Sequence, residues 1–253
     1  MRNIKRHERS DILIHWFNAG CWLVLLISGL GLIKNERLNP LGAWLPDALR
    51  ALFSGGGGGT AGGAVLLVIH EVAGVVWVLG LAAYLAVNAG GARFFLREIF
   101  SVRPGDLAWL GRKMGRMTLG PLLGGHGELP PQGYYNMGQK AFAQASVLGG
   151  AAIVVTGLVL LLSAKLLPAA ATGLIGWAVT LHYLAVGLVF AGLLVHIYMA
   201  AVSPEEKPGL RSMFTGQVPE DYARHHHGLW LEALDSGEKA DLGDDPGDDT
   251  GVE

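Results

Sequence analysis

Four long apolar segments alternate with polar segments along this 253-residue chain. They cover about 12–33, 64–88, 141–167 and 174–202. A helix needs roughly 20 apolar residues to cross a hydrocarbon core of about 30 Å, and each segment supplies that length. The pattern therefore predicts an all-α protein, an integral membrane four-helix bundle.

Composition supports a membrane protein. Hydrophobic residues make up 51% of the chain and charged residues 16%, below the roughly 25% of soluble domains. The mean hydropathy is +0.39. No basic surface suited to nucleic acid is evident, so a nucleic-acid partner is not expected. Cys21 is the only cysteine, which excludes an internal disulfide and a cysteine-ligated cluster within the chain.

Basic residues give an expected orientation. Fifteen Lys and Arg fall in the N-terminal arm, the loop between the second and third segments, and the C-terminal tail, and four fall in the other two loops. The positive-inside rule then places both termini in the cytoplasm. We expect a cytoplasmic arm over 1–11, a four-helix domain over 12–202, and a cytoplasmic tail over 203–253.

The polar segments have their own expected features. A short interfacial helix is predicted over 45–53, followed by a glycine spacer over 55–59. The basic and aromatic loop over 93–140 predicts helices that lie on lipid headgroups. Beyond Trp230 the chain has nine carboxylates and one lysine, so the tail is predicted to be disordered after about 232.

Histidines inside the apolar segments are the strongest chemical signal, because ionisable groups in a membrane are usually kept for function. His182 and His196 lie 14 residues apart in the fourth segment. On a helix this spacing returns to within about 40° of the same face and spans roughly 21 Å along the axis. Both imidazoles therefore leave one helical face at different membrane depths.

The predicted topology sorts the histidines by depth. His15 and His196 lie toward the cytoplasmic side, whereas His70 and His182 lie toward the outer side. Two facing imidazoles are the axial ligands of a six-coordinate b-type haem that carries electrons. The four histidines predict two stacked haems, with the pairs His15/His196 and His70/His182.

Other interpretations of the histidines are weaker. Each could be a hydrogen-bonded interior polar residue, but four at two matched depths make that improbable. A zinc site lacks HExxH and suitable neighbouring ligands. A proton relay would need membrane carboxylates, and Glu71 beside His70 is the one candidate.

With these residues, the chain resembles the gamma subunit of respiratory formate dehydrogenase, the dihaem cytochrome b of the bacterial inner membrane. The resemblance rests on His15-Trp16, on His70, and on the 14-residue histidine spacing in the fourth segment. It also rests on GYYNMGQK over 133–140 and on GLRSMFTGQV over 209–218, which the triplet His225, His226 and His227 follows.

The resemblance implies a membrane electron-transfer and quinone-reducing subunit of an oxidoreductase complex. Two haem b groups would be held by His15/His196 and His70/His182. Electrons would come from formate oxidised on a molybdenum or tungsten alpha subunit, through an iron–sulfur beta subunit at the outer face. A quinone, menaquinone or ubiquinone, would be reduced near Asn136 and Gly138, close to His196. Asn136 could also be the N-cap of the third helix.

There are two kinds of alternative: a haem protein with a different electron donor, and a protein that carries no electrons. The donor could instead be a nickel–iron hydrogenase or a thiosulfate reductase. A different class of protein would be a haem-free membrane anchor or a proton-coupled transporter. The glycine-rich outer loop, and Glu71 where the family often has proline, depart from the family pattern. His7 and His126 are expected on the surface, and the triplet at 225–227 in a solvated cytoplasmic turn.

Overall fold

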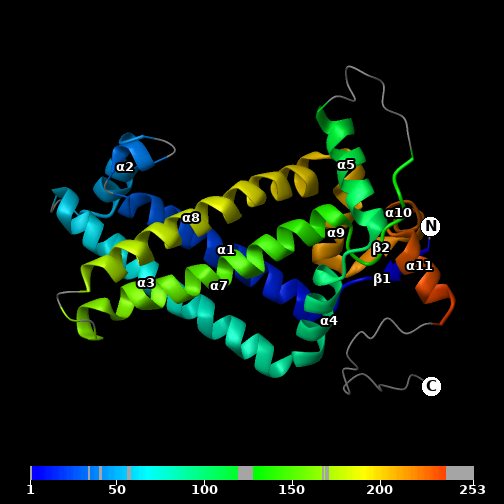
Figure 1. Ribbon diagram of the computed structural model, residues 1–253, viewed down its shortest axis with the longest axis horizontal. Helices are drawn as coiled ribbons and strands as arrows, with labels where there is room; N and C mark the ends of the chain where they lie inside the picture. Colours follow the sequence, from blue (N-terminus) through cyan, green and yellow to red (C-terminus); the bar gives the residue numbers. More distant parts are fainter. Residues whose placement is uncertain are drawn as a thin grey trace. The chain divides into compact units, whose positions relative to one another are not determined.

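The computed structural model describes residues 2–33, 35–39, 42–55, 58–118, 128–166, 168 and 171–237. Their helices and strands are labelled in Figure 1, and they form two compact units. Unit 1 comprises Met1–Ile12, Asn88–Ile153 and Val179–Glu253. Unit 2 comprises Leu13–Val87 and Val154–Ala178.

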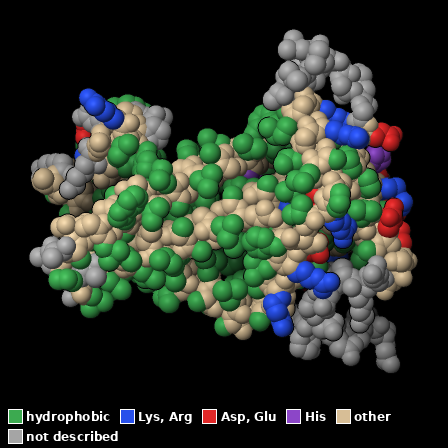
Figure 2. All heavy atoms as spheres, in the orientation of Figure 1, with side chains coloured by type: hydrophobic (Ala, Val, Ile, Leu, Met, Phe, Trp, Pro, Cys, Tyr) green, Lys and Arg blue, Asp and Glu red, His purple; other side chains and the backbone are tan. Residues whose placement is uncertain are grey.

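Long apolar helices dominate both units. They are α1 (Arg9–Leu32), α3 (Gly58–Val87), α7 (Met137–Leu166) and α8 (Thr172–Ile197). Within the described residues, these are the four helices long and apolar enough to cross a membrane. Large hydrophobic side chains cover their outward faces, as the green atoms in Figure 2 show, which suits lipid rather than water. The prediction of an all-α protein with four apolar helices is confirmed.

In unit 2, a short helix packs against the C-terminal end of α1. This helix, α2 (Trp44–Leu52), agrees with the predicted helix over 45–53. Arg50 donates to the backbone oxygens of Gly31 and Ile33 at 3.0 and 3.2 Å, which satisfies carbonyls left unpaired where α1 ends. A side chain at Gly62 would collide with the backbone of Arg50, so this glycine lets α2 and α3 approach closely. A 3-10 turn, η1 (Glu36–Leu38), precedes α2.

The predicted glycine spacer over 55–59 is partly wrong. α3 already begins at Gly58, and residues 56 and 57 lie outside the described residues. Gly58 and Gly59 are the first two residues of the 30-residue helix α3. Helix formation is cooperative, so the long apolar helix keeps these two glycines helical despite their low helix propensity.

Outside the long helices, unit 1 contains an extramembrane layer made of short elements. It includes α4 (Ala89–Phe100) and α5 (Pro104–Thr118), and after α8 a π-helical turn η2 (Tyr198–Val202) and a 3-10 turn η3 (Pro204–Glu206). The chain continues through α9 (Lys207–Thr215), α10 (Glu220–His226) and α11 (Gly228–Asp235). Lys, Arg, Asp and Glu side chains gather over these elements in Figure 2.

The N-terminal arm and the segment that follows α9 pair with each other in this layer. Strand β1 (Asn3–Lys5) pairs antiparallel with β2 (Gln217–Pro219), with Ile4 opposite Val218. Behind the pair lies a core of Tyr134, Val218, Tyr222, Ala223 and Trp230, packed against Ile4, Phe94, Tyr135 and Leu234. The segment before α7 is therefore enclosed by the N-terminal arm and the C-terminal helices.

Several expectations for the polar residues are corrected here. The solvated turn predicted at 225–227 is wrong for His227, which is completely buried. His7 is half-buried, and its ring lies edge-on to Tyr134 at 6.1 Å between centroids. α11 continues to Asp235, past the predicted onset of disorder, because Trp230 and Leu231 bury its inner face. His126 and residues 238–253 lie outside the described residues.

Candidate functional site

His70 lies in α3 of unit 2, against the end of α1. Its Nδ1 lies 3.0 Å from the hydroxyl of Ser28. Gly29 follows directly, and a Cβ placed there would lie 3.3 Å from Cε1 of His70. A serine and a glycine together therefore hold the imidazole by a hydrogen bond on one edge and leave room for the ring beside the α1 backbone.

The serine contacts favour one tautomer of His70. The Ser28 hydroxyl lies 2.7 Å from the carbonyl of Val24 and 3.2 Å from that of Leu25, either of which can accept its single proton. With that proton directed to its own helix, the hydroxyl oxygen accepts from Nδ1 of His70. Metal-ligating histidines commonly have this arrangement, with one ring nitrogen held by an outer hydrogen bond. The contact with Ser28 therefore suits coordination of a metal through Nε2 of His70.

His182 and His196 lie on α8 within unit 1. The backbone of Ile153 in α7 hydrogen-bonds to His182. His196 stacks on the Phe142 ring of α7, with centroids 4.6 Å apart and ring planes 14° from parallel. A Cβ at Gly192, one turn earlier, would lie 2.9 Å from that phenyl ring, so the glycine makes room for Phe142. Contacts with α7 therefore fix the planes of both rings.

A π-helical turn begins two residues after His196, at Tyr198. π-Helical turns are rare and are often found at functional sites. The sequence analysis missed this turn, because the apolar pattern of the segment continues through it without a glycine or proline.

His15 lies near the start of α1, at the edge of unit 2. Its ring meets Trp16 edge-on, with centroids 5.3 Å apart. Each unit thus contributes two of the four predicted ligands. Within the part of the chain that the structure describes, no three His, Cys, Asp or Glu side chains come together as a metal site. A haem iron needs only two protein ligands, because the porphyrin supplies the other four.

The residues predicted for a quinone site open α7. Asn136 is the N-cap: its Oδ1 accepts from the Gln139 N–H at 2.9 Å, and Gln139 Oε1 accepts from the Asn136 N–H at 3.0 Å. This reciprocal pair is a capping box. Because Oδ1 is committed to the helix, the Nδ2 group is the part of the amide able to donate to a ligand. Capping and ligand binding are therefore compatible in Asn136.

Gly138 presents a second donor. Among the first amides of α7, Met137 N–H donates to Gln132 and Gln139 N–H to Asn136. For Gly138 N–H, the described residues provide no acceptor. The space that a side chain would take is bordered by Asn136 Oδ1 at 3.3 Å and by the indole of Trp109 at 3.5 Å. This N–H lies at the N-terminal end of a 30-residue helix, where the helix dipole stabilises negative charge on a ligand.

Behind this segment, the extramembrane layer buries a cluster of polar residues. Arg6 donates to the carbonyl of Tyr134 at 2.7 Å, and its guanidinium lies over the rings of Tyr134 and Trp230. The imidazole of His227 hydrogen-bonds through Nδ1 to the carbonyl of Gly133 at 2.9 Å. These contacts hold the backbone that leads into Asn136.

Burial shifts the titration of this cluster. It lowers the pKa of His227 well below the ordinary value, with a smaller contribution from the charge of Arg6. Burial also raises the pKa of the Tyr134 hydroxyl, which donates to the backbone oxygen of Arg6. Near neutral pH, His227 and Tyr134 are therefore both uncharged beside the buried Arg6.

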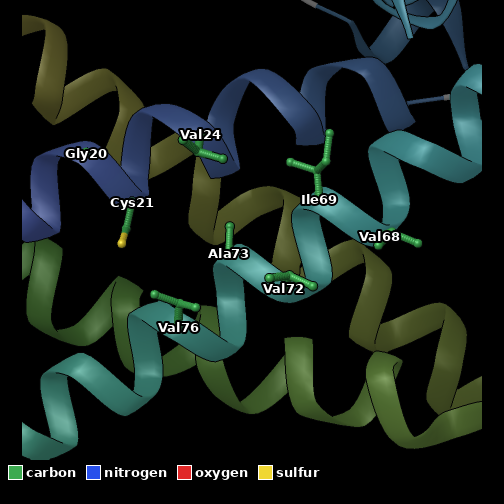
Figure 3. Close-up of a pocket in the computed structure, with 8 residues that line it drawn as sticks. All are labelled: Gly20, Cys21, Val24, Val68, Ile69, Val72, Ala73 and Val76. Carbon is green, nitrogen blue, oxygen red and sulfur yellow. The ribbon is translucent and has the colours of Figure 1, made fainter. Parts of the chain in front are cut away.

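An apolar groove lies elsewhere, between α1 and α3 of unit 2 (Figure 3). It has a volume of about 510 Å³ and is open on one side. It is lined by Gly20, Cys21, Val24, Val68, Ile69, Val72, Ala73 and Val76. None of the predicted histidines lines it, and its aliphatic walls offer contacts to hydrocarbon.

Comparison with known proteins gives the family. The model of a family described as prokaryotic cytochrome b561 matches residues 6–216, which include all four long helices. The chain belongs to the prokaryotic cytochrome b561 family. Curated relatives are the formate dehydrogenase cytochrome b556(fdo) subunits of Escherichia coli K12 and Escherichia coli O157:H7. Each is 24% identical over 231 residues, which cover 91% of this chain and 93% of the relative.

Membership makes this chain a membrane cytochrome with b-type haem, and the resemblance seen in its motifs is confirmed. The residues present suit that group. Imidazole is the donor that b-type haem takes from such proteins, and the hydroxyl of Ser28 lies at Nδ1 of His70, the kind of outer hydrogen bond that suits a ligand through Nε2. The contacts of Ser28 and Phe142 were not foreseen, because nothing local in the sequence links positions 28 and 70 or 142 and 196.

Proposed function

We propose that this cytochrome b561-family protein is the membrane cytochrome b subunit of a formate dehydrogenase and passes electrons through two b haems to a quinone. The observation that carries the proposal is the set of four histidines in α1, α3 and α8, three of the four long apolar helices of a chain whose curated relatives are formate dehydrogenase cytochromes. Formate oxidation itself would occur on a partner subunit.

In this proposal, His15 with His196 and His70 with His182 are the axial ligand pairs predicted from membrane depth. Haem iron supplies one-electron transfer, and two imidazoles leave no open position for oxygen chemistry. The protein contributes ring orientation. Ser28 favours one tautomer of His70, and Phe142 fixes the plane of His196.

Quinone reduction is assigned to the start of α7. The Asn136 Nδ2 group and the Gly138 N–H would donate to a quinone carbonyl oxygen, which becomes more negative as the ring accepts electrons. Donors already held in place stabilise such charge without reorganisation. Phe142 follows Gly138 by one turn of α7, and its ring stacks on His196. The donors therefore lie one helical turn from a residue that contacts a proposed haem ligand.

The proposal also includes the orientation of the chain in the membrane, its partner subunits and the type of quinone. We place both termini in the cytoplasm of a bacterium, with the chain in its inner membrane, from the distribution of Lys and Arg. An iron–sulfur subunit would contact the outer face and connect to a molybdenum or tungsten subunit. The quinone would be menaquinone or ubiquinone.

A membrane preparation that contains the full complex tests the proposal. Visible spectra before and after addition of formate should show reduced b-type haem, and pyridine haemochrome should return two haems per chain. Added quinone should then reoxidise the haems. Reduction by hydrogen but not by formate would assign the chain to a hydrogenase, reduction by neither would overturn the donor, and absence of haem would indicate a haem-free anchor or transporter.

A further inference from the structure

The quinone donors at the start of α7 lie beside a buried tryptophan. Trp109 belongs to α5, and its side chain is only 6% exposed. Two carbons of its six-membered ring, Cζ3 and Cη2, lie 3.5 and 3.7 Å from the position of a Cβ on Gly138. The indole thus lies directly beside the α carbon of Gly138.

Three hydrogen bonds from α7 hold α4 and α5 at this point. Gln144 donates to the carbonyl of Ile99 at 2.6 Å, at the end of α4. One turn earlier, the Lys140 ammonium donates to the carbonyl of Ser101 at 2.7 Å and to the carboxylate of Asp106 at 2.8 Å. Asp106 in turn accepts from the backbone N–H of Arg103 at 3.0 Å, which caps the start of α5.

The Lys140–Asp106 ion pair is almost fully buried, with 3% and 2% of the two side chains exposed. A buried ion pair is a costly way to join two helices, because both charges lose their water, and an apolar pair of similar size is often at least as stabilising. What the ion pair adds is a single geometry. Asp106 precedes Trp109 by three residues on the same helix, so the pair fixes where the indole lies.

We propose that Trp109 is a quinone-contacting residue and that Lys140 and Asp106 are its positioning pair. The inference rests on the proposed function, since it extends the quinone site at Asn136 and Gly138. A quinone carbonyl bonded to the Gly138 N–H brings its planar ring against the edge of the indole. Aromatic contacts of this kind strengthen binding by roughly twofold to tenfold beyond the burial of area.

Two variants change the contact in different ways. Trp109→Leu removes the aromatic edge, and Gly138→Ala places a methyl group 3.5 Å from the indole while leaving the indole in place. Membranes with the full complex are first reduced with formate, and haem reoxidation is then followed at increasing menaquinone-analogue concentration. Each variant should raise the quinone KM by up to about tenfold with haem content and formate reduction unchanged. Trp77→Leu, a buried tryptophan in α3 of unit 2, is the control and should leave the KM unchanged.

The positioning pair has a separate test. In Lys140→Met/Asp106→Asn the ion pair is lost, and the asparagine still accepts from Arg103. The quinone KM should increase about threefold to tenfold. The thermal unfolding midpoint should fall, because the carbonyl of Ser101 loses its donor and a polar amide stays buried. A role in stability alone predicts the lower midpoint with an unchanged KM.

The outcomes separate the two proposals. A parent complex whose haems are not reduced by formate, or not reoxidised by quinone, contradicts the proposed function. A parent that works while Trp109→Leu keeps the parent KM overturns the assignment of Trp109. A KM that rises equally in Trp109→Leu and Trp77→Leu also overturns it, because the effect would then belong to packing in general.

Discussion

The long apolar helices and the extramembrane layer satisfy buried polar groups in different ways. In the helices of unit 2, Ser28 bonds to the carbonyl of its own helix and to His70, and the indole of Trp77 donates to Asn18 at 2.6 Å. In the layer, Arg6 bonds to Tyr134 and His227 to Gly133, contacts that join the two ends of the chain to its middle.

The difference predicts how each region responds to damage. A polar side chain in an apolar helix depends on one or two neighbours, since lipid supplies no alternative partner. Its loss should affect one site. A buried network depends on all of its members, so its energetics belong to the group. Changes in the layer should therefore affect stability and the start of α7 together.

The largest expected effect comes from the four proposed ligands in the apolar helices. His70→Ala and His182→Ala should each lose one haem, and His15→Ala and His196→Ala should each lose the other, because iron needs both imidazoles. Pyridine haemochrome per mole of protein should fall from two to about one. His7→Ala, outside the apolar segments, serves as control. Loss of both haems in every variant would mean that the helices do not behave as separate sites.

Next is Asn136, where the layer meets α7. Asn136→Asp keeps the oxygen that accepts from Gln139 and removes the Nδ2 donor. Quinone reduction should fall about 100-fold, in line with the loss of one prepositioned donor, while haem content and thermal stability remain. Asn88→Asp changes another N-cap, that of α4, and should leave turnover unchanged. Equal turnover in Asn136→Asp and the parent would mean that Asn136 acts only as the N-cap of α7.

Ser28→Ala tests the outer hydrogen bond of His70. Removing such a partner typically weakens metal binding by about 10- to 100-fold, and the lower value applies here because the ring remains packed beside Gly29. Haem loss to apomyoglobin from the purified complex should speed up for one haem only. Ser163→Ala removes a hydroxyl that donates to the carbonyl of Leu160 in its own helix, and it should have no effect on either haem. Faster loss of both haems would contradict a local role.

The smallest effect is a pH dependence in the layer. Burial lowers the pKa of His227, so an unfolded chain binds a proton that the folded chain does not once the pH falls below about 6.5. The free energy of unfolding should therefore fall with decreasing pH in that window, by at most about 1.4 kcal/mol per pH unit, and level off below the folded pKa.

Thermal unfolding between pH 7.5 and 5.5, followed by tryptophan fluorescence, measures this slope. His227→Asn keeps a donor toward Gly133 and cannot titrate, so its slope should be smaller. His225→Asn is the control, because His225 is exposed in α10, two residues before His227. A parent slope equal to that of His227→Asn would show that His227 does not contribute.

Much of the fold could be predicted from the sequence because the bilayer imposes a simple length and composition on a helix. The four apolar segments and the helix at 44–52 were foreseen for that reason. The N-cap at Asn136 was also foreseen, since an amide before an apolar run is a local signal. The buried state of His227 was not, because it depends on Gly133, 94 residues away.

The sequence by itself determined the four apolar helices, the histidines within them and the capping chemistry at the start of α7, since each depends on hydrophobicity or on neighbours within one helical turn. Only the tertiary structure decided that Ser28 hydrogen-bonds to His70, that Phe142 stacks on His196, that Lys140 pairs with Asp106, and that Trp109 lies beside Gly138. These contacts join residues far apart along the chain, and the free energy that selects them comes from packing and from satisfying buried polar groups rather than from local propensity.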